Sequence, residues 1–211
     1  MAILDLIASQ LRGNTLTQMS QQLGTDETTT AKAVSVALPL LLGGLTRNAA
    51  TPQGAASLDA ALTRDHDGSL LDAPQRAFAD PSAFKAGGIL GHVFGQRQAP
   101  VEQGVAKATG LDAQRTGQLL MMLAPLVMAA LARARATQAG AGGSAGEVLQ
   151  REQSNIERQV PGLGGLASIL DRDGDGQIAD DIASIAAGRL GGTANSGGLG
   201  GILGGLFGEK R

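Results

Sequence analysis

Residues 26–49 read Asp-Glu-Thr-Thr-Thr-Ala-Lys-Ala-Val-Ser-Val-Ala-Leu-Pro-Leu-Leu-Leu-Gly-Gly-Leu-Thr-Arg-Asn-Ala, and residues 112–135 read Asp-Ala-Gln-Arg-Thr-Gly-Gln-Leu-Leu-Met-Met-Leu-Ala-Pro-Leu-Val-Met-Ala-Ala-Leu-Ala-Arg-Ala-Arg. A shift of 86 positions places Pro39 on Pro125 and aligns the two stretches without a gap. The ungapped match extends from residue 3 to about residue 54. Glycine and proline in register over such a length indicate an internal duplication.

Each copy predicts the same order of four helices. Nothing in the chain alternates with period two over a useful length, so no strands are expected. The sequence therefore predicts an all-α fold, with two tandem copies of a multi-helix unit packed together and a partial third copy as a C-terminal helix. The expected helices lie near residues 3–12, 15–23, 27–49 and 53–64 in the first copy, and near 84–95, 100–109, 113–136 and 144–158 in the second.

The ends of the expected helices carry matched signals. Gly24 and Gly110 follow the second helix of each copy, where glycine supplies a left-handed residue after the last turn. Asp26 and Asp112 then stand at the N-cap, where a side chain accepts a hydrogen bond from the first turn of the next helix. The matched prolines inside the long third helix predict a bend at the same place in both copies.

The composition favours a core of small aliphatic side chains. Apolar residues make up 43% of the chain, Trp, Tyr and Cys are absent, and there are four Phe. The most apolar stretches, 34–45 and 119–132, are shorter than the ~18–20 residues of a membrane-spanning helix, so we expect buried core helices. The first residues lack a basic start and Asp5 interrupts their apolar run, which is not typical of a secretory signal.

A third, partial copy follows the two complete ones. Gly-Gly-Ile-Leu-Gly-His-Val-Phe-Gly (87–95) recurs as Gly-Gly-Ile-Leu-Gly-Gly-Leu-Phe-Gly (200–208). A helix copied from the start of a unit has an apolar face that needs a partner surface, on its own chain or on the next subunit. The residues expected to make this contact are Ile202, Leu203, Leu206 and Phe207.

The expected domain boundaries follow from these copies. Residues 136–144 are rich in Gly and Ala and indicate a loop inside the second copy, and 193–200 indicates a flexible linker. The expected division is a first helical repeat at 1–83, a second repeat with an acidic loop at 84–192, and a Gly-rich linker with a C-terminal helix at 193–211.

The sharpest chemical motif is Asp-Arg-Asp-Gly-Asp-Gly-Gln-Ile-Ala-Asp-Asp-Ile (171–182). Alternating acids followed by glycine match positions 1, 3, 5 and 6 of an EF-hand-type loop, which converges oxygen ligands on Ca²⁺. The twelfth position holds Ile182, so the closing carboxylate has to come one residue earlier. The candidate ligands of Ca²⁺ are Asp171, Asp173, Asp175, Gln177 and Asp181. The alternative is a polar turn whose acids cap the next helix.

A weaker echo of this loop lies in the first copy, as Asp-His-Asp-Gly-Ser-Leu-Leu-Asp (65–72). Thr63 stands where the first acid would be. The pattern therefore favours a turn that links two helices over a metal site.

The sequence shows no catalytic constellation, so we expect no enzyme activity. His66 and His92, the two histidines of the chain, have no paired serine or acid. Residues 19–35 have a helix-turn-helix look, but their second helix begins Asp-Glu-Thr-Thr-Thr, without the side chains that read DNA. The net charge of −2 also argues against a nucleic-acid partner.

Several motifs together resemble a known family: Ser-Gln-Gln-Leu-Gly (20–24), Ala-Leu-Pro-Leu-Leu-Leu-Gly-Gly-Leu (37–45), the echo at 65–72, and Leu-Asp-Arg-Asp-Gly-Asp-Gly (170–176). In these motifs the chain resembles the bacterial domain of unknown function 937 family, related to the YidB-like proteins. The resemblance covers nearly the whole chain. It implies a bacterial, helical, cytoplasmic protein, and it carries no established activity from which catalytic residues would transfer.

Three functions follow from the sequence as hypotheses. The first is a non-catalytic protein that self-associates into a homo-oligomer or filament through its C-terminal Gly-rich helix, because head-to-tail docking generates rings or filaments. In the plainer alternative the same helix caps its own chain. The second is a calcium-binding interaction module. The third is peripheral membrane association through the Gly-rich tail, although residues 197–208 are too short to span a bilayer.

Overall fold

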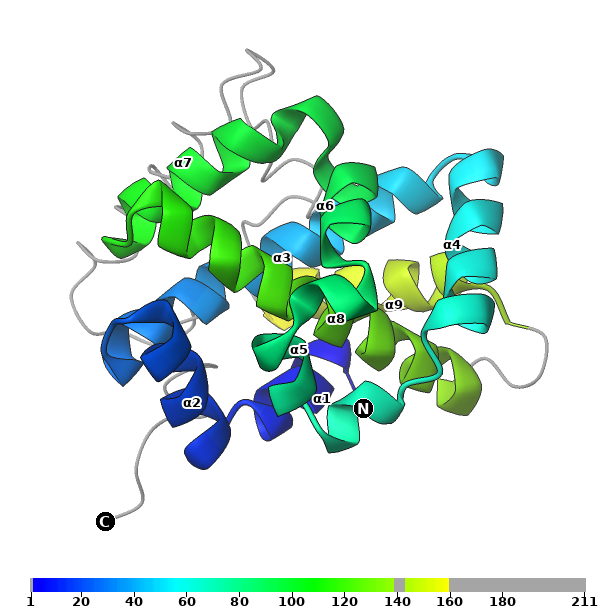
Figure 1. The fold of residues 1–211 in the computed structure, drawn as a ribbon. Helices are drawn as coiled ribbons and strands as arrows, with labels where there is room; N and C mark the ends of the chain where they lie inside the picture. Colours follow the sequence, from blue (N-terminus) through cyan, green and yellow to red (C-terminus); the bar gives the residue numbers. More distant parts are fainter. Residues whose placement is uncertain (1, 139–142, 160–211) are drawn as a thin grey trace.

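The computed structural model describes residues 2–138 and 143–159 of the chain. All regular elements within these residues are helical, which confirms the all-α class (Figure 1). The long helices α3 and α8 lie in the middle, and shorter helices surround them. In chain order the elements are α1 (Ile3–Gln10), α2 (Asn14–Leu23), α3 (Glu27–Ala49), α4 (Pro52–Asp65), η1 (Ser69–Asp72), α5 (Gln75–Ala79), η2 (Pro81–Phe84), α6 (Ala86–Phe94), η3 (Gly95–Arg97), α7 (Gln98–Thr109), α8 (Ala113–Gln138) and α9 (Ala145–Gln159).

The core is built around α3 and α8, which pack against each other. Both helices continue through their buried prolines, Pro39 and Pro125. As helices they are longer than the apolar stretches we identified, with 23 and 26 residues, and by length and composition each is able to cross a membrane. Their apolar windows are 67% and 78% buried inside the fold. This burial in the core explains their apolar composition.

The matched capping signals are confirmed. The side chain of Asp26 accepts a hydrogen bond from the backbone N–H of Thr29 at 2.8 Å, and Asp112 accepts one from Arg115 at 2.8 Å. The two preceding helices, α2 and α7, end at glycines with left-handed backbone, with φ of +63° and +86°. Both long helices therefore begin from the same local construction, a left-handed glycine followed two residues later by a capping aspartate.

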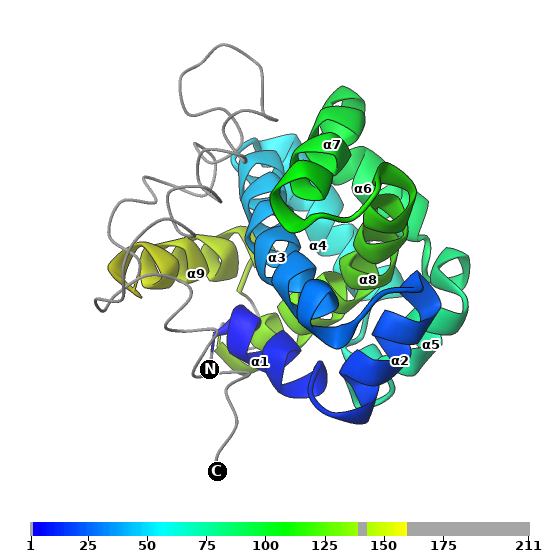
Figure 2. The ribbon, with the colours of Figure 1, turned by 90° about the vertical axis from the view of Figure 1, so that its left-hand side faces the viewer.

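Helices from the two expected repeats share one core. Helix α1 packs against α8, and α9 packs against α3. Figure 2 shows α1 and α9 next to each other at one edge of the molecule. There the buried carboxylate of Glu152, on α9, accepts a hydrogen bond from the backbone N–H of Leu4 at 3.2 Å. A side chain from α9 thus caps the first turn of α1, 148 residues earlier in the chain.

The segment between α4 and α6 contains three elements that sequence analysis missed, η1, α5 and η2; η3, after α6, was missed as well. The segment packs mainly against α8 and α2, and it buries Leu70, Leu71 and Phe78. Arg133, on α8, holds it by donating to the carbonyl of Gly68 at 3.0 Å and to the carboxylate of Asp72 at 2.8 Å. The segment therefore covers one side of the core.

Candidate functional site

A trough lies between α4 and α6. Both helices pack against α3 and α8, which form the floor of the trough. At one end Lys85, at the start of α6, pairs with Asp65 at the end of α4, with Nζ 2.8 Å from Oδ1. At the other end Asn48 donates to the carbonyl of His92 at 2.7 Å. The two walls run in opposite directions, and they enclose a cavity of about 410 Å³.

The inside of the trough is mostly apolar. Leu45 of α3 and Met128 of α8 come from the floor, and Leu58, Ile89 and Val93 come from the walls. All five side chains belong to the buried core, with at most 8% of their surface exposed. Because they are held by the packing of four helices, this lining is formed in advance of any ligand.

Charged groups gather at the end of the trough where α4 ends. Arg64 donates to Oδ2 of Asp65 from Nε at 3.0 Å and from Nη2 at 2.8 Å, while Lys85 occupies Oδ1. These two cations hold the pKa of the Asp65 carboxyl far below its usual range. The carboxylate therefore stays ionised, and the charged side chains that line this end are two cations and one anion.

The two histidines line the same cavity from different positions. His66 follows α4 at the charged end and is only 8% exposed. Burial lowers the pKa of His66, and Lys85 acts in the same direction, while Asp65 and Asp67 oppose them. His92 lies on α6 at the opposite end and is exposed. Sequence analysis found no partner for either histidine, and their shared cavity depends on pairing α4 with α6 across the core.

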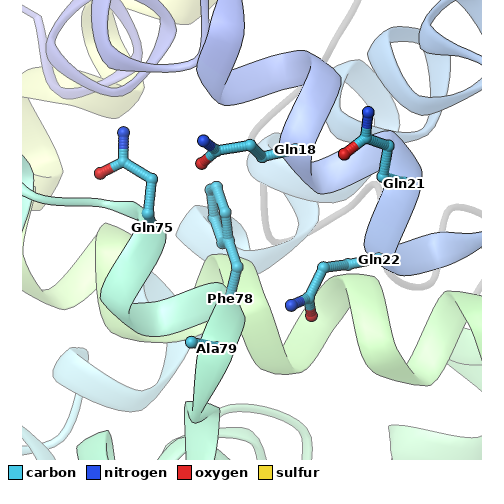
Figure 3. A pocket seen from close by; sticks show the side chains of 6 residues that line it. All are labelled: Gln18, Gln21, Gln22, Gln75, Phe78 and Ala79. Atoms are coloured by element: carbon cyan, nitrogen blue, oxygen red, sulfur yellow. The ribbon is translucent and has the colours of Figure 1, made fainter.

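A second cavity, the glutamine groove, lies between α2 and α5 and has a volume of about 460 Å³. Figure 3 shows the ring of Phe78 standing among the amide side chains that surround it. Phe78 is 3% exposed. The lining residues are Gln18, Gln21, Gln22, Gln75, Phe78 and Ala79. With amides and no charged group, this groove offers hydrogen bonds but no site for a general acid or base.

A family model described as "Bacterial protein of unknown function (DUF937)" matches residues 5–134, more than half of the 211 residues. The chain belongs to this bacterial family. The matched range confirms the resemblance but is shorter than the nearly complete coverage that the motifs suggested. It runs from α1 into α8 and contains every residue that lines the trough. No curated protein and no solved structure was found to match.

The echo of the acidic loop in this DUF937 chain is a helix-linking turn, as expected. Asp67 accepts hydrogen bonds from the backbone N–H of Ser69 at 2.9 Å and from its hydroxyl at 2.6 Å. Asp65 and Asp72 are both paired with cations. In the part of the chain that the structure describes, no three His, Asp or Glu side chains come together as a metal site. The acids of this turn therefore serve turn geometry and ion pairs.

Two sets of expected site residues of the DUF937 chain lie outside the described residues. The first is the candidate calcium loop, Asp171, Asp173, Asp175, Gln177 and Asp181. The second is the candidate self-association set, Ile202, Leu203, Leu206 and Phe207. Both stay predictions from the sequence.

Proposed function

We propose that this chain is a non-catalytic bacterial protein, made of two copies of one helical unit, which self-associates in the cytoplasm through residues 200–208. The observation that carries the proposal is the burial of the matching motif in α6. Its four apolar residues are at most 8% exposed: Ile89, Leu90, Val93 and Phe94. The copy at 200–208 keeps an apolar residue at each of these positions. A helix with this face gains stability only against a matching surface.

The close fit of α6 to its neighbour supports this reading of the motif. A Cβ placed on Gly44 of α3 would stand 2.4 Å from Cγ1 of Val93. The apolar side of α6 therefore approaches the backbone of α3 directly. On its other side, Gly87, Gly88 and Gly91 would each accept a Cβ without meeting an atom within 4 Å. The tail copy repeats this division, with glycines at 200, 201 and 204.

The tandem-repeat part of the proposal is supported by local backbone geometry. Gly13 after α1 has φ +56° and ψ −129°, and Gly95 after α6 has φ +55° and ψ −128°. This conformation is accessible essentially to glycine alone. The two glycines are 82 positions apart, while the long helices align at 86. The second copy therefore has four extra residues between these glycines and the glycines that end α2 and α7, about one helical turn, and they lie in η3 and α7. This offset interrupts the ungapped match that we expected from residue 3.

The test of self-association is the mass of the chain in solution. Size-exclusion chromatography with light scattering is run over a range of concentrations on the full chain, on a chain lacking residues 195–211, and on the double variant Leu203→Asp, Leu206→Asp. We expect an assembly for the full chain and a smaller mass for both variants. Lys210→Ala is the matched control, because it changes the same segment outside the apolar positions. The proposal fails if all four proteins contain the same number of subunits at every concentration.

A calcium-binding module is the second candidate, favoured by the spacing of acids at 171, 173 and 175 before Gly176. Calorimetric titration with Ca²⁺ tests it, with Asp173→Ala, Asp175→Ala as the variant and Mg²⁺ as the competing ion. We expect heat from the native chain that the variant loses. Absence of heat at millimolar Ca²⁺ would remove this candidate.

A further inference from the structure

We propose that the trough between α4 and α6 binds an amphipathic monoanion, a linear carboxylate with a medium-length aliphatic chain. Its carboxylate would lie at the end formed by Arg64 and Lys85, and its chain would lie along the apolar lining from Leu58 to Met128. The inference is independent of self-association, because it uses only residues of the described fold.

The charge of the site selects an anion. Arg64 and Lys85 are 72% and 60% exposed as side chains, whereas Asp65 between them is 16% exposed. The carboxylate that neutralises one of the two cations is thus the most covered of the three groups. Among the residues that line the trough one positive charge remains in excess, carried by donors that are reachable from solvent. The nearby Asp67 does not line the trough and accepts hydrogen bonds from Ser69.

The position of Lys85 adds to this argument. Among the described residues it is the one with positive φ that is not glycine, at +57°. A side chain there costs about 1 kcal/mol or more against an ordinary conformation, and asparagine or glycine would suit the backbone better. The sequence nevertheless places a lysine at the point where its ammonium group reaches the trough.

The size of the trough selects a small molecule. A volume of about 410 Å³ falls in the range of roughly 300–1,000 Å³ typical of ligand cavities. The trough therefore suits a small molecule.

One wall of the trough provides a clean way to block it. Gly88 lines the cavity, and a Cβ at this position would meet no heavy atom within 4 Å. Gly87 is equally open and exposed, but it does not line the cavity. Leucine at 88 would fill the trough, and leucine at 87 would project elsewhere from the same helix. Both changes replace a helical glycine by a good helix former, so neither should weaken the fold.

The experiment is calorimetric titration of the full chain with sodium decanoate and, separately, with decyltrimethylammonium, which has the same chain length and the opposite charge. We expect decanoate to bind at least about tenfold more tightly than the cation. Octanoate should bind about tenfold more weakly than decanoate, because each buried methylene changes affinity by roughly threefold. Equal binding of the anion and the cation would overturn the proposal in favour of unspecific apolar adsorption.

Four variants locate the site, with thermal unfolding by circular dichroism as the check on folding. Gly88→Leu should lose decanoate binding by about tenfold or more, while Gly87→Leu should bind as the native chain does. Lys85→Asn keeps a residue that tolerates positive φ and should weaken binding by about fivefold. Asp65→Asn removes the competing carboxylate and should tighten binding by about threefold. Native affinity in a folded Gly88→Leu chain, or weaker binding in Asp65→Asn, would contradict the assignment.

Discussion

Two glycines show how far single residues depend on their surroundings. Gly54 is in the first turn of α4, where a Cβ would lie 1.9 Å from the backbone oxygen of Asn48. Gly88 on α6 has no heavy atom within 4 Å of that position. We expect Gly54→Ala to lower the free energy of unfolding by about 1–3 kcal/mol, because backbone has to move. Gly88→Ala should raise it by up to about 1 kcal/mol. Urea unfolding measures both, and equal effects of the two substitutions would contradict the geometry.

Glu152 gives the stability a pH dependence through its buried carboxyl. Burial raises its pKa, Asp5 acts in the same direction, and the N–H groups of Ile3 and Leu4 oppose them. Because the pKa of Glu152 is raised in the fold, the stability that Glu152 contributes is complete below its unfolded pKa of about 4.5. This contribution is lost as pH rises through the pKa in the folded chain. We expect Glu152→Gln to remove this loss, so that it gains stability relative to the native chain between pH 4.5 and 7. If Glu152→Gln gained stability relative to the native chain only below pH 4.5, the pKa of Glu152 would be lowered rather than raised in the fold, and the prediction would be wrong.

His66 gives the stability of the fold a pH dependence opposite to that of Glu152. Burial lowers its pKa below 6.5, so its contribution to stability is complete above 6.5 and is lost as pH falls through the folded value. Because Glu152 acts oppositely over the same range, the sign is read from the variant: on going from pH 7.5 to pH 5, His66→Gln should lose less melting temperature, or gain more, than the native chain. His92→Gln is the control for this comparison, because it makes the same exchange at an exposed histidine of α6. An unchanged pH profile in His66→Gln would show that another group is responsible.

Single residues were predictable from sequence where both partners are close along the chain. Asp26 and Asp112 were identified as caps because the amide each one accepts from lies three residues away. The role of Glu152 as a cap could not be predicted, since the backbone N–H of Leu4 that donates to it lies 148 residues earlier. Local hydrogen bonds leave a pattern in the sequence, and tertiary ones do not.

At the scale of elements, long helices were predicted well and short ones were missed. The bounds of α3 and α8 agree with the expected 27–49 and 113–136 to within two residues. The elements η1, α5 and η2 have four or five residues each, too few for a helical period to be recognised. Their shape is set instead by contacts with α8 and by caps such as Asp80, which accepts from Ala83 at 3.1 Å.

Asp59 joins three helices, and we expect its removal to weaken the contacts among all of them. From α4 its Oδ1 accepts from Nη1 of Arg135 on α8 at 3.1 Å and from the backbone N–H of Ala145, at the start of α9, at 2.8 Å. We expect Asp59→Ala to cost about 1–2 kcal/mol, because two partly buried donors lose their acceptor. Asp59→Asn keeps an acceptor and should cost less. Hydrogen exchange at the Ala145 amide should accelerate in the Ala variant, and native protection there would contradict the proposed junction.

At the scale of the molecule, the trough shows which part of a site cannot be predicted from sequence. Its charged end joins Arg64 and Asp65 to Lys85, 20 residues later, and its floor includes Met128 of α8. Sequence analysis treated residues 65–72 as a possible metal echo and His92 as a lone helix residue. Only the antiparallel placement of α4 and α6 over α3 and α8 turns these residues into one cavity. That placement depends on packing across the core, which periodicity along one helix does not specify.

The interleaving of helices predicts that the described fold unfolds as one unit. Because α1 packs against α8 and α9 against α3, neither 1–83 nor 84–159 contains all the partners of its own core residues. We expect a single transition in urea, coincident by circular dichroism and by NMR signals from both halves. A fragment of residues 84–159 alone should have little cooperative structure, since α8 would expose the surface that α3 and α1 cover. Mixing it with fragment 1–83 should restore helicity. Two separate transitions in the intact chain, or a cooperatively folded 84–159 fragment, would show instead that each sequence copy is an independent domain.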